Sequence, residues 1–156
     1  MSRVICGLKW ARGPVPRPEN LPKGRPRGAK AEGLRYERLV CSRLEQGKPG
    51  LWWEFEDQNG HGFCQTDLVL FGPTQVLVVE VKLSATDAAW KQLGKLYLPV
   101  LGMALGKNCY GLQMAKNLWG KQTGVKVCKT LGEALPALKA GENRVLVHWA
   151  GLGPLF

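Results

Sequence analysis

Three charged side chains, Asp67, Glu80 and Lys82, interrupt two apolar strand-like segments of the sequence. The segment 76–83 is otherwise entirely apolar, which is typical of a strand covered on both faces. Because side chains alternate along a strand, Glu80 and Lys82 lie on the same face of it. A carboxylate and an ammonium group that end an otherwise apolar face are candidates for acid–base or metal chemistry rather than for an ordinary solvated surface.

The turn at 72–75 predicts which residues face these charges. With the two-residue loop tip at its centre, cross-strand partners have numbers that sum to 147, so Asp67 faces Glu80 and Gln65 faces Lys82. The Cβ atoms of opposed residues lie about 4.5–5.5 Å apart. Two carboxylates at this distance repel each other, which indicates a bound cation or a shared proton.

A hard divalent cation accounts for this arrangement. Mg²⁺ takes oxygen ligands from one or two carboxylates and keeps several water molecules for a substrate, so Asp67 and Glu80 are candidate ligands. Lys82 is then placed to orient an attacking water molecule and to steady a phosphate. The alternative is a buried salt-bridge cluster of the same three side chains, without a chemical role.

A predicted helix over 29–46 adds a fourth candidate residue. Its apolar residues recur at helical spacing: Leu34, Val40, Cys41 and Leu44. Glu37 lies within this stripe, and a carboxylate on a buried face needs a partner or a metal. Because this helix is expected to pack over the sheet, we expect Glu37 to reach the site directly or through a water molecule.

The remaining pattern predicts an α/β fold. Strand-like runs at 51–56, 63–71 and 76–83 suggest an antiparallel meander. Asn59-Gly60 is a strong hairpin signal between the first two, and it would place Glu54 opposite Gln65. The later elements are expected to be a helix from Thr86 towards Leu105 that Pro99 kinks or splits, strands at 108–114, 125–130 and 144–149, and a short helix at 131–139.

These features resemble the PD-(D/E)xK nuclease superfamily. The matching motifs, all within 33–114, are Gly33-Leu-Arg-Tyr-Glu37, Gln65-Thr-Asp67 and Glu80-Val-Lys82. Thr66 stands where the superfamily usually has proline. The resemblance implies a restriction-endonuclease-like core over 31–156, in which a central mixed β-sheet is flanked by helices and an antiparallel hairpin carries the site.

The resemblance also implies how the site works. Its catalytic residues would be Glu37, Asp67, Glu80 and Lys82. Its metal ligands would be Asp67, Glu80 and the backbone carbonyl of Val81, with Glu37 through water. The cofactor would be Mg²⁺, for which Mn²⁺ would substitute, and the substrate would be DNA.

Two groups within the superfamily are similar to this chain. RecB-like exonucleases share the Gly-x-x-x-Glu start and carry Gln-x-x-x-Tyr on the next helix. Here the corresponding sequence is Gln92-Leu-Gly-Lys-Leu-Tyr97, which is one residue longer. Because residues five apart on an α-helix point about 140° apart, we expect Tyr97 to face away from Gln92. Small basic members include Holliday-junction resolvases and phage nucleases, which usually act as dimers.

Three functions are therefore open. The size and charge favour a structure-specific endonuclease of the Holliday-junction resolvase type, for which the resemblance implies a homodimer. A RecB-like exonuclease is the second hypothesis. The third is a non-catalytic nucleic-acid-binding protein that has kept a nuclease-like fold.

The formal net charge of +10 indicates a polyanionic partner, although it could serve solubility alone or an acidic protein. Residues 1–30 hold eight basic residues, one acid and five prolines, so they are expected to form an extended basic arm or a tail without contacts. The residues expected to contact nucleic acid are Gln65, Lys91, Gln92, Lys95, Arg25, Arg27 and Lys30. Trp52 and Trp53 could stack on bases.

Other function classes are less consistent with the composition. The five cysteines are scattered and include no C-x-x-C pair, so neither a disulfide framework nor a zinc knuckle is indicated. The longest charge-free apolar stretch, 96–105, is interrupted by Pro99 and is far shorter than the ~20 residues that span a bilayer. The N-terminus has no secretory pattern. We therefore expect a cytoplasmic protein with no membrane partner.

Overall fold

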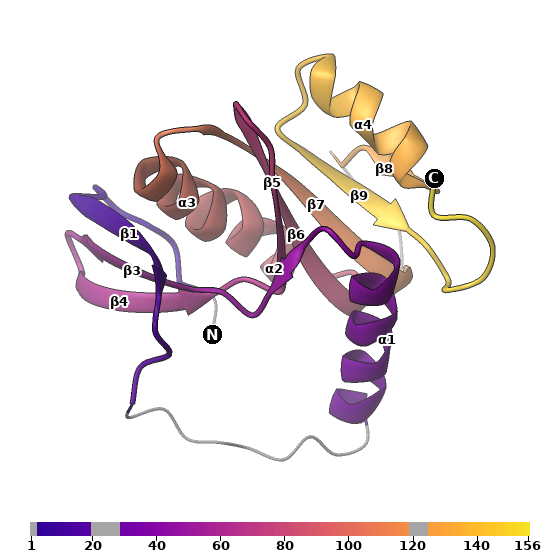
Figure 1. Cartoon of the computed structure of the whole chain (residues 1–156), viewed down its shortest axis with the longest axis horizontal. Helices are drawn as coiled ribbons and strands as arrows, with labels where there is room; N and C mark the ends of the chain where they lie inside the picture. Colours follow the sequence, from indigo (N-terminus) through magenta and orange to yellow (C-terminus); the bar gives the residue numbers. More distant parts are fainter. Residues whose placement is uncertain (1–2, 20–28, 119–124) are drawn as a thin grey trace.

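Two β-sheets and the helices around them make up the computed structural model, which describes residues 3–19, 29–118 and 125–156 (Figure 1). The elements in chain order are β1 (Trp10–Val15), α1 (Ala29–Arg43), β2 (Lys48–Pro49), β3 (Trp52–Asp57), β4 (Gly60–Gln65), β5 (Leu68–Phe71), β6 (Gln75–Ser84), α2 (Asp87–Gln92), the π-helical segment η1 (Leu93–Tyr97), α3 (Leu98–Leu105), β7 (Asn108–Asn117), β8 (Val127–Cys128), α4 (Leu131–Lys139) and β9 (Arg144–His148).

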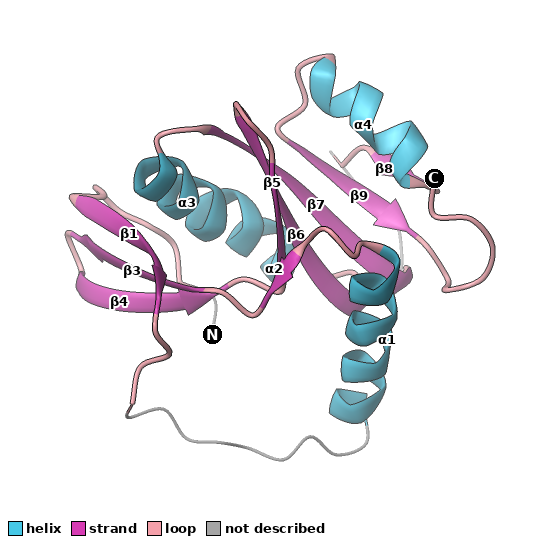
Figure 2. Cartoon of the chain, viewed as in Figure 1, coloured by secondary structure: helices cyan, strands magenta, loops and turns pink. Residues whose placement is uncertain are grey.

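The main sheet has six strands in the order β2-β5-β6-β7-β9-β8. The pairs β2–β5 and β5–β6 are antiparallel, whereas β6–β7, β7–β9 and β9–β8 are parallel. The long strand β6 lies inside this sheet, as its continuous apolar sequence requires. The predicted α/β class and mixed central sheet flanked by helices are confirmed at this level (Figure 2).

Helices cover both faces of the main sheet. On one face, α1 and α4 pack on β6, β7 and β9. The buried residues of these helices, with Leu44 directly after α1, are Tyr36, Val40, Leu44, Leu131, Ala134 and Leu138. On the other face, η1 and α3 lie between the main sheet and a small three-stranded sheet (Figure 1). Within the described part of the chain, no helix has the length and apolar character needed to cross a bilayer.

The small sheet has the order β1-β3-β4 and corrects the predicted meander. The run 63–71 is not one strand. It divides at Thr66, so that β4 pairs with β3 in the small sheet and β5 pairs with β6 in the main sheet. Thr66 is fully buried at this crossing, and its hydroxyl accepts a 3.0 Å hydrogen bond from the Trp53 indole.

The β3–β4 turn also differs from the prediction. Asp57 pairs with Gly60, so the two-residue loop is Gln58-Asn59 rather than Asn59-Gly60. The Asp57 carboxylate accepts a hydrogen bond from the Asn59 N–H at 2.9 Å, which fixes the turn one residue earlier. As a result Glu54 faces Phe63, and the expected Glu54–Gln65 pair is wrong.

Part of the expected N-terminal arm belongs to this sheet. Trp10–Val15 form β1, which pairs antiparallel with β3. Pro14 is accommodated because β1 is an edge strand, where a missing N–H can face away from the ladder. Residues 1–30 therefore do not form one separate arm, and the segment 20–28, with Arg25 and Arg27, lies outside the described residues.

The predicted helix from Thr86 is present in three parts. The Thr86 hydroxyl caps its start by accepting from the Ala89 N–H at 3.1 Å. The backbone then widens into η1, where the Leu98 N–H bonds to the Leu93 carbonyl. Pro99 cannot donate to the Lys95 carbonyl one turn earlier. That carbonyl instead accepts from the Ile5 N–H at 2.9 Å, which ties the N-terminal segment to this helix.

Gly111 on β7 controls how closely η1 approaches the main sheet. A Cβ atom at this position would lie 2.8 Å from Leu93 Cγ, and Leu93 is fully buried. We expect Gly111→Ala to lower the free energy of unfolding by about 1–3 kcal/mol in urea denaturation, because the buried Leu93 must shift.

The matched control is Gly33→Ala in α1, where no atom lies within 4 Å of an added Cβ. This variant should be neutral or more stable by up to about 1 kcal/mol. Equal stability of Gly111→Ala and the wild type would contradict the packing described here.

Candidate active site

Asp67 lies at the corner where the chain passes from the small sheet into the main sheet. It directly precedes β5, and its Oδ2 accepts a 2.8 Å hydrogen bond from the Val81 N–H. The carboxylate thus replaces a backbone acceptor beside β6. The predicted register is confirmed for Val69–Val78 and Phe71–Val76, whereas Asp67 itself is outside the ladder.

Glu80 is almost completely buried, with 3% of its surface exposed. Its Oε1 lies 3.4 Å from the ammonium group of Lys82, whose side chain is 43% exposed. Its Oε2 is buried and has no hydrogen-bond partner among the described residues. A buried carboxylate oxygen without a donor is unfavourable unless the group is protonated or a cation binds there.

Ionisation of Asp67 and Glu80 at the same time is unfavourable. Burial, followed by the negative charge of Asp67, raises the pKa of Glu80 to about 8, against the opposing effect of Lys82. Burial also raises the pKa of Asp67, although the Val81 N–H and Lys82 stabilise its charged form. A site that holds both groups as carboxylates at neutral pH therefore favours an added positive charge.

Glu37 reaches the same electrostatic environment from α1. Burial, followed by the charge of Asp67, raises the pKa of Glu37 to about 7, while Lys82 and Arg38 act in the opposite direction. The side chain is only partly buried. The predicted placement of an acid from α1 near the hairpin is thus consistent with the structure.

Tyr97 is a further residue near the site, and the helix geometry assumed in predicting its orientation was wrong. The expected 140° separation from Gln92 assumes an α-helix, but η1 is a π-turn, which winds one extra residue into a turn. Gln92 and Tyr97 are thereby brought closer in phase. Tyr97 is 6% exposed, and its pKa is raised by burial, then by the nearby Glu80 and Asp67 carboxyls.

A polar pocket of about 280 Å³ lies between α1 and the carboxyl ends of β7 and β9, beyond the sequence predictions. Arg35 and Lys116 line it, together with Glu32. Both basic side chains are exposed, and neither forms an ion pair within the described ranges. Arg35 and Lys116 are far apart in the sequence, and only the packing of α1 beside the end of β7 brings them together. The sequence alone did not predict this packing.

Those residues expected to contact nucleic acid that the structure describes are spread over several elements. Gln65 does not face Lys82: it pairs with Trp52 in the small sheet, and its amide donates to the Gly50 carbonyl at 3.2 Å. This expectation failed because the chain changes sheets at Thr66.

The other expected contacts remain predictions. Lys91 and Lys95 are exposed, and Gln92 is partly buried, on α2 and η1. Lys30 lies in the first turn of α1, and its side chain is outside the described part of the structure, as are Arg25 and Arg27.

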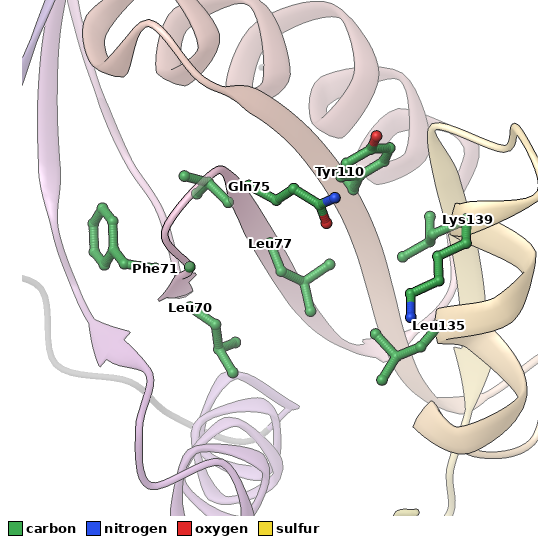
Figure 3. A pocket seen from close by; sticks show the side chains of 10 residues that line it. Leu70, Phe71, Gln75, Leu77, Tyr110, Leu135 and Lys139 are labelled. Atoms are coloured by element: carbon green, nitrogen blue, oxygen red, sulfur yellow. The ribbon is translucent and has the colours of Figure 1, made fainter.

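A second pocket, of about 360 Å³, lies at the opposite end of β6 (Figure 3). Leu70, Leu77 and Leu135 give it apolar walls, with Tyr110 and Lys139 at its margin (Figure 3). It is lined by residues from the start of β6 rather than from the segment that carries Glu80 and Lys82. The carboxyl pair is therefore the candidate site, and this pocket is separate from it.

The donor groups present fit a hard divalent cation. No cluster of three or more His, Cys, Asp or Glu side chains suited to a metal occurs in the described ranges 3–19, 29–118 and 125–156. Mg²⁺ needs only one or two carboxylates and otherwise keeps water. A strand residue directs its N–H and carbonyl to the same edge. The Val81 carbonyl therefore points to the side from which Asp67 accepts the Val81 N–H.

Comparison of the chain with protein-family models, with curated proteins and with solved structures found no match.

The raised pKa of Glu80 predicts how stability depends on pH without metal. Between its ordinary value of 4.5 and about 8, folded Glu80 keeps a proton that the unfolded chain has lost. The free energy of unfolding therefore falls as pH rises through this window. Glu80→Gln removes this effect, so we expect it to be more stable than the wild type at pH 8.5 by at least about 1.4 kcal/mol, the equivalent of one pKa unit.

The measurement is denaturation in EDTA at several pH values. The stability difference should shrink towards pH 4.5, and the exposed Glu142→Gln serves as the control. A stability difference for Glu80→Gln that does not change with pH would contradict the burial argument.

Proposed function

We propose that this chain is a Mg²⁺-dependent deoxyribonuclease that hydrolyses phosphodiester bonds at the Asp67–Glu80–Lys82 site. The observation that carries the proposal is the buried carboxyl pair, in which Glu80 Oε2 has no hydrogen-bond partner among the described residues and Lys82 lies 3.4 Å from Oε1. A purely structural salt bridge would not require a second carboxyl group at the same place.

The roles follow from position and charge. Asp67, Glu80 and the Val81 carbonyl would hold Mg²⁺, which when bound would stabilise negative charge that develops on the phosphate. The hydrogen bond from the Val81 N–H at 2.8 Å fixes Asp67 in place. Lys82 is partly exposed, so its ammonium group can contact both Glu80 and a substrate phosphate or an attacking water.

Glu37 has a different role in this proposal. Its pKa of about 7, raised mainly by burial, suits a group that gains and loses a proton near neutral pH. From α1 it would orient a water molecule beside Asp67. Arg35 on α1 and Lys116 at the carboxyl end of β7 would contribute to phosphate binding outside the reacting bond.

The substrate preference has two candidates. The small size and the net charge of +10 support a structure-specific endonuclease of the Holliday-junction resolvase type. The π-turn supports a RecB-like exonuclease, because it removes the expected misalignment of Tyr97 with Gln92. Both candidates use the same proposed metal site.

Glu80→Gln should lose nuclease activity without losing its folded structure. We expect Glu80→Gln to cleave DNA at least about a hundredfold more slowly than the wild type while remaining folded, since it loses the negative charge of a proposed metal ligand. Asp67→Asn and Lys82→Ala should show comparable losses, and Glu142→Gln should not. In a thermal-shift assay, Mg²⁺ should raise the melting temperature of the wild type more than that of Glu80→Gln.

Two results would count against the enzyme. Robust cleavage by Asp67→Asn, Glu80→Gln and Lys82→Ala alike would place the activity elsewhere. DNA binding that EDTA does not affect, with no cleavage under Mg²⁺ or Mn²⁺, would favour a non-catalytic binding protein.

A substrate panel should distinguish the two subtypes. Wild-type protein with Mg²⁺ or Mn²⁺ would be given linear, circular, single-stranded and four-way-junction DNA. The endonuclease is expected to cleave circular or junction DNA, because it cuts within a strand and needs no free end at the cleavage point. Stepwise loss of nucleotides from linear DNA, with circles left intact, would instead identify the exonuclease.

A further inference from the structure

The outer face of the small sheet carries a row of exposed aromatic rings. Trp10 on β1 is 37% exposed, and Phe63 on β4 is 40% exposed. His61 lies between them, with ring centroids 6.0 Å from Trp10 and 4.9 Å from Phe63. The opposite face of this sheet is the buried one, and Trp53, expected to stack on bases, is fully buried there.

Charged residues are interleaved with these rings. Arg12 and His61 both bond to the Glu54 carboxylate, at 2.5 and 2.6 Å, so two groups share one acid. Lys9 lies 3.9 Å from Glu56. The side chains of Arg12 and Lys9 remain 69% and 56% exposed, although each is paired with a glutamate, so cations and acids alternate on this face.

The aromatic face lies close to Asp67 along the chain. Pairing places Trp10, Glu56 and His61 across the sheet at one level, and Val15, Trp52 and Gln65 at another. From Gln65, only Thr66 separates β4 from Asp67. The four residue steps from Phe63 to Asp67 span at most roughly 14 Å. This is the length of about four stacked nucleotides at about 3.4 Å each.

We infer that the outer face of the small sheet, through Trp10, His61 and Phe63, binds the bases of a single-stranded segment of the nucleic acid and leads it to Asp67. The inference rests on the proposed function and adds the strand state of the substrate. Aromatic rings with interspersed cations stack unpaired bases without regard to sequence. Paired bases in a duplex do not expose the ring faces that such stacking needs.

The test is a binding assay in EDTA, where no cleavage occurs. Fluorescence anisotropy would measure the affinity of the full chain for a labelled 20-nucleotide oligo(dT) and for a 20-base-pair duplex at one fixed salt concentration. The double variant Trp10→Ala/Phe63→Ala should bind the single strand at least tenfold more weakly, with less than a threefold change for the duplex.

Two controls separate stacking from altered folding. Phe71→Ala removes a ring that is 43% exposed on the main sheet, and it should leave single-strand affinity unchanged. The double variant Trp10→Phe/Phe63→Trp keeps ring faces in place and should retain affinity within threefold. Circular dichroism and thermal unfolding would establish that each variant is folded.

Two results would overturn the inference: unchanged single-strand affinity in Trp10→Ala/Phe63→Ala, or equal weakening for single strand and duplex. Unchanged affinity together with conversion of a dimer to monomers by this variant would identify the face as a contact between copies of the chain. Because the assay needs no cleavage, failure of the nuclease proposal would appear separately, in the Glu80→Gln activity measurement.

Discussion

Two carboxyl groups held beside each other in a buried position constrain everything around them. Ionising both Asp67 and Glu80 is unfavourable away from water, and their mutual repulsion is weakly screened there. The surroundings cannot relax easily, because β6 is held between β5 and β7 and is covered on both faces. A rigid arrangement of like charges of this kind favours either a shared proton or a small ion of opposite charge, since both relieve the repulsion without moving the strands.

The parts of the site that the sequence could predict are those determined by local pattern. A tight turn and two alternating strands fix the pairing of Val69 with Val78, so the hairpin register was accessible. The placement of Gln65 was not, because the chain leaves one sheet for the other at Thr66, and a buried hydrogen bond to Trp53 stabilises that crossing. No residue type in 63–71 signals this change, since both halves of the run have strand-like sequences.

Long-range pairing accounts for most of the other differences. The proline-rich start of the chain reads locally as an extended arm, yet Trp10–Val15 join β3, about 40 residues further along. A free arm and an edge strand both have an extended backbone, and only the presence of a partner strand distinguishes one from the other. The helices were predicted more completely, because caps such as Thr86 and apolar periodicity are contained within each segment.

The π-turn at Leu93–Tyr97 has a consequence for how relatives of this chain would be recognised. A motif written as a fixed number of residues assumes that each residue advances the helix by the same angle. Here one additional residue is absorbed within a single wide turn, while the helix before and after it keeps ordinary geometry. An ungapped alignment would treat this residue as the loss of the motif. A search that permits a one-residue gap within 93–97 would preserve the equivalence of the positions on either side of it.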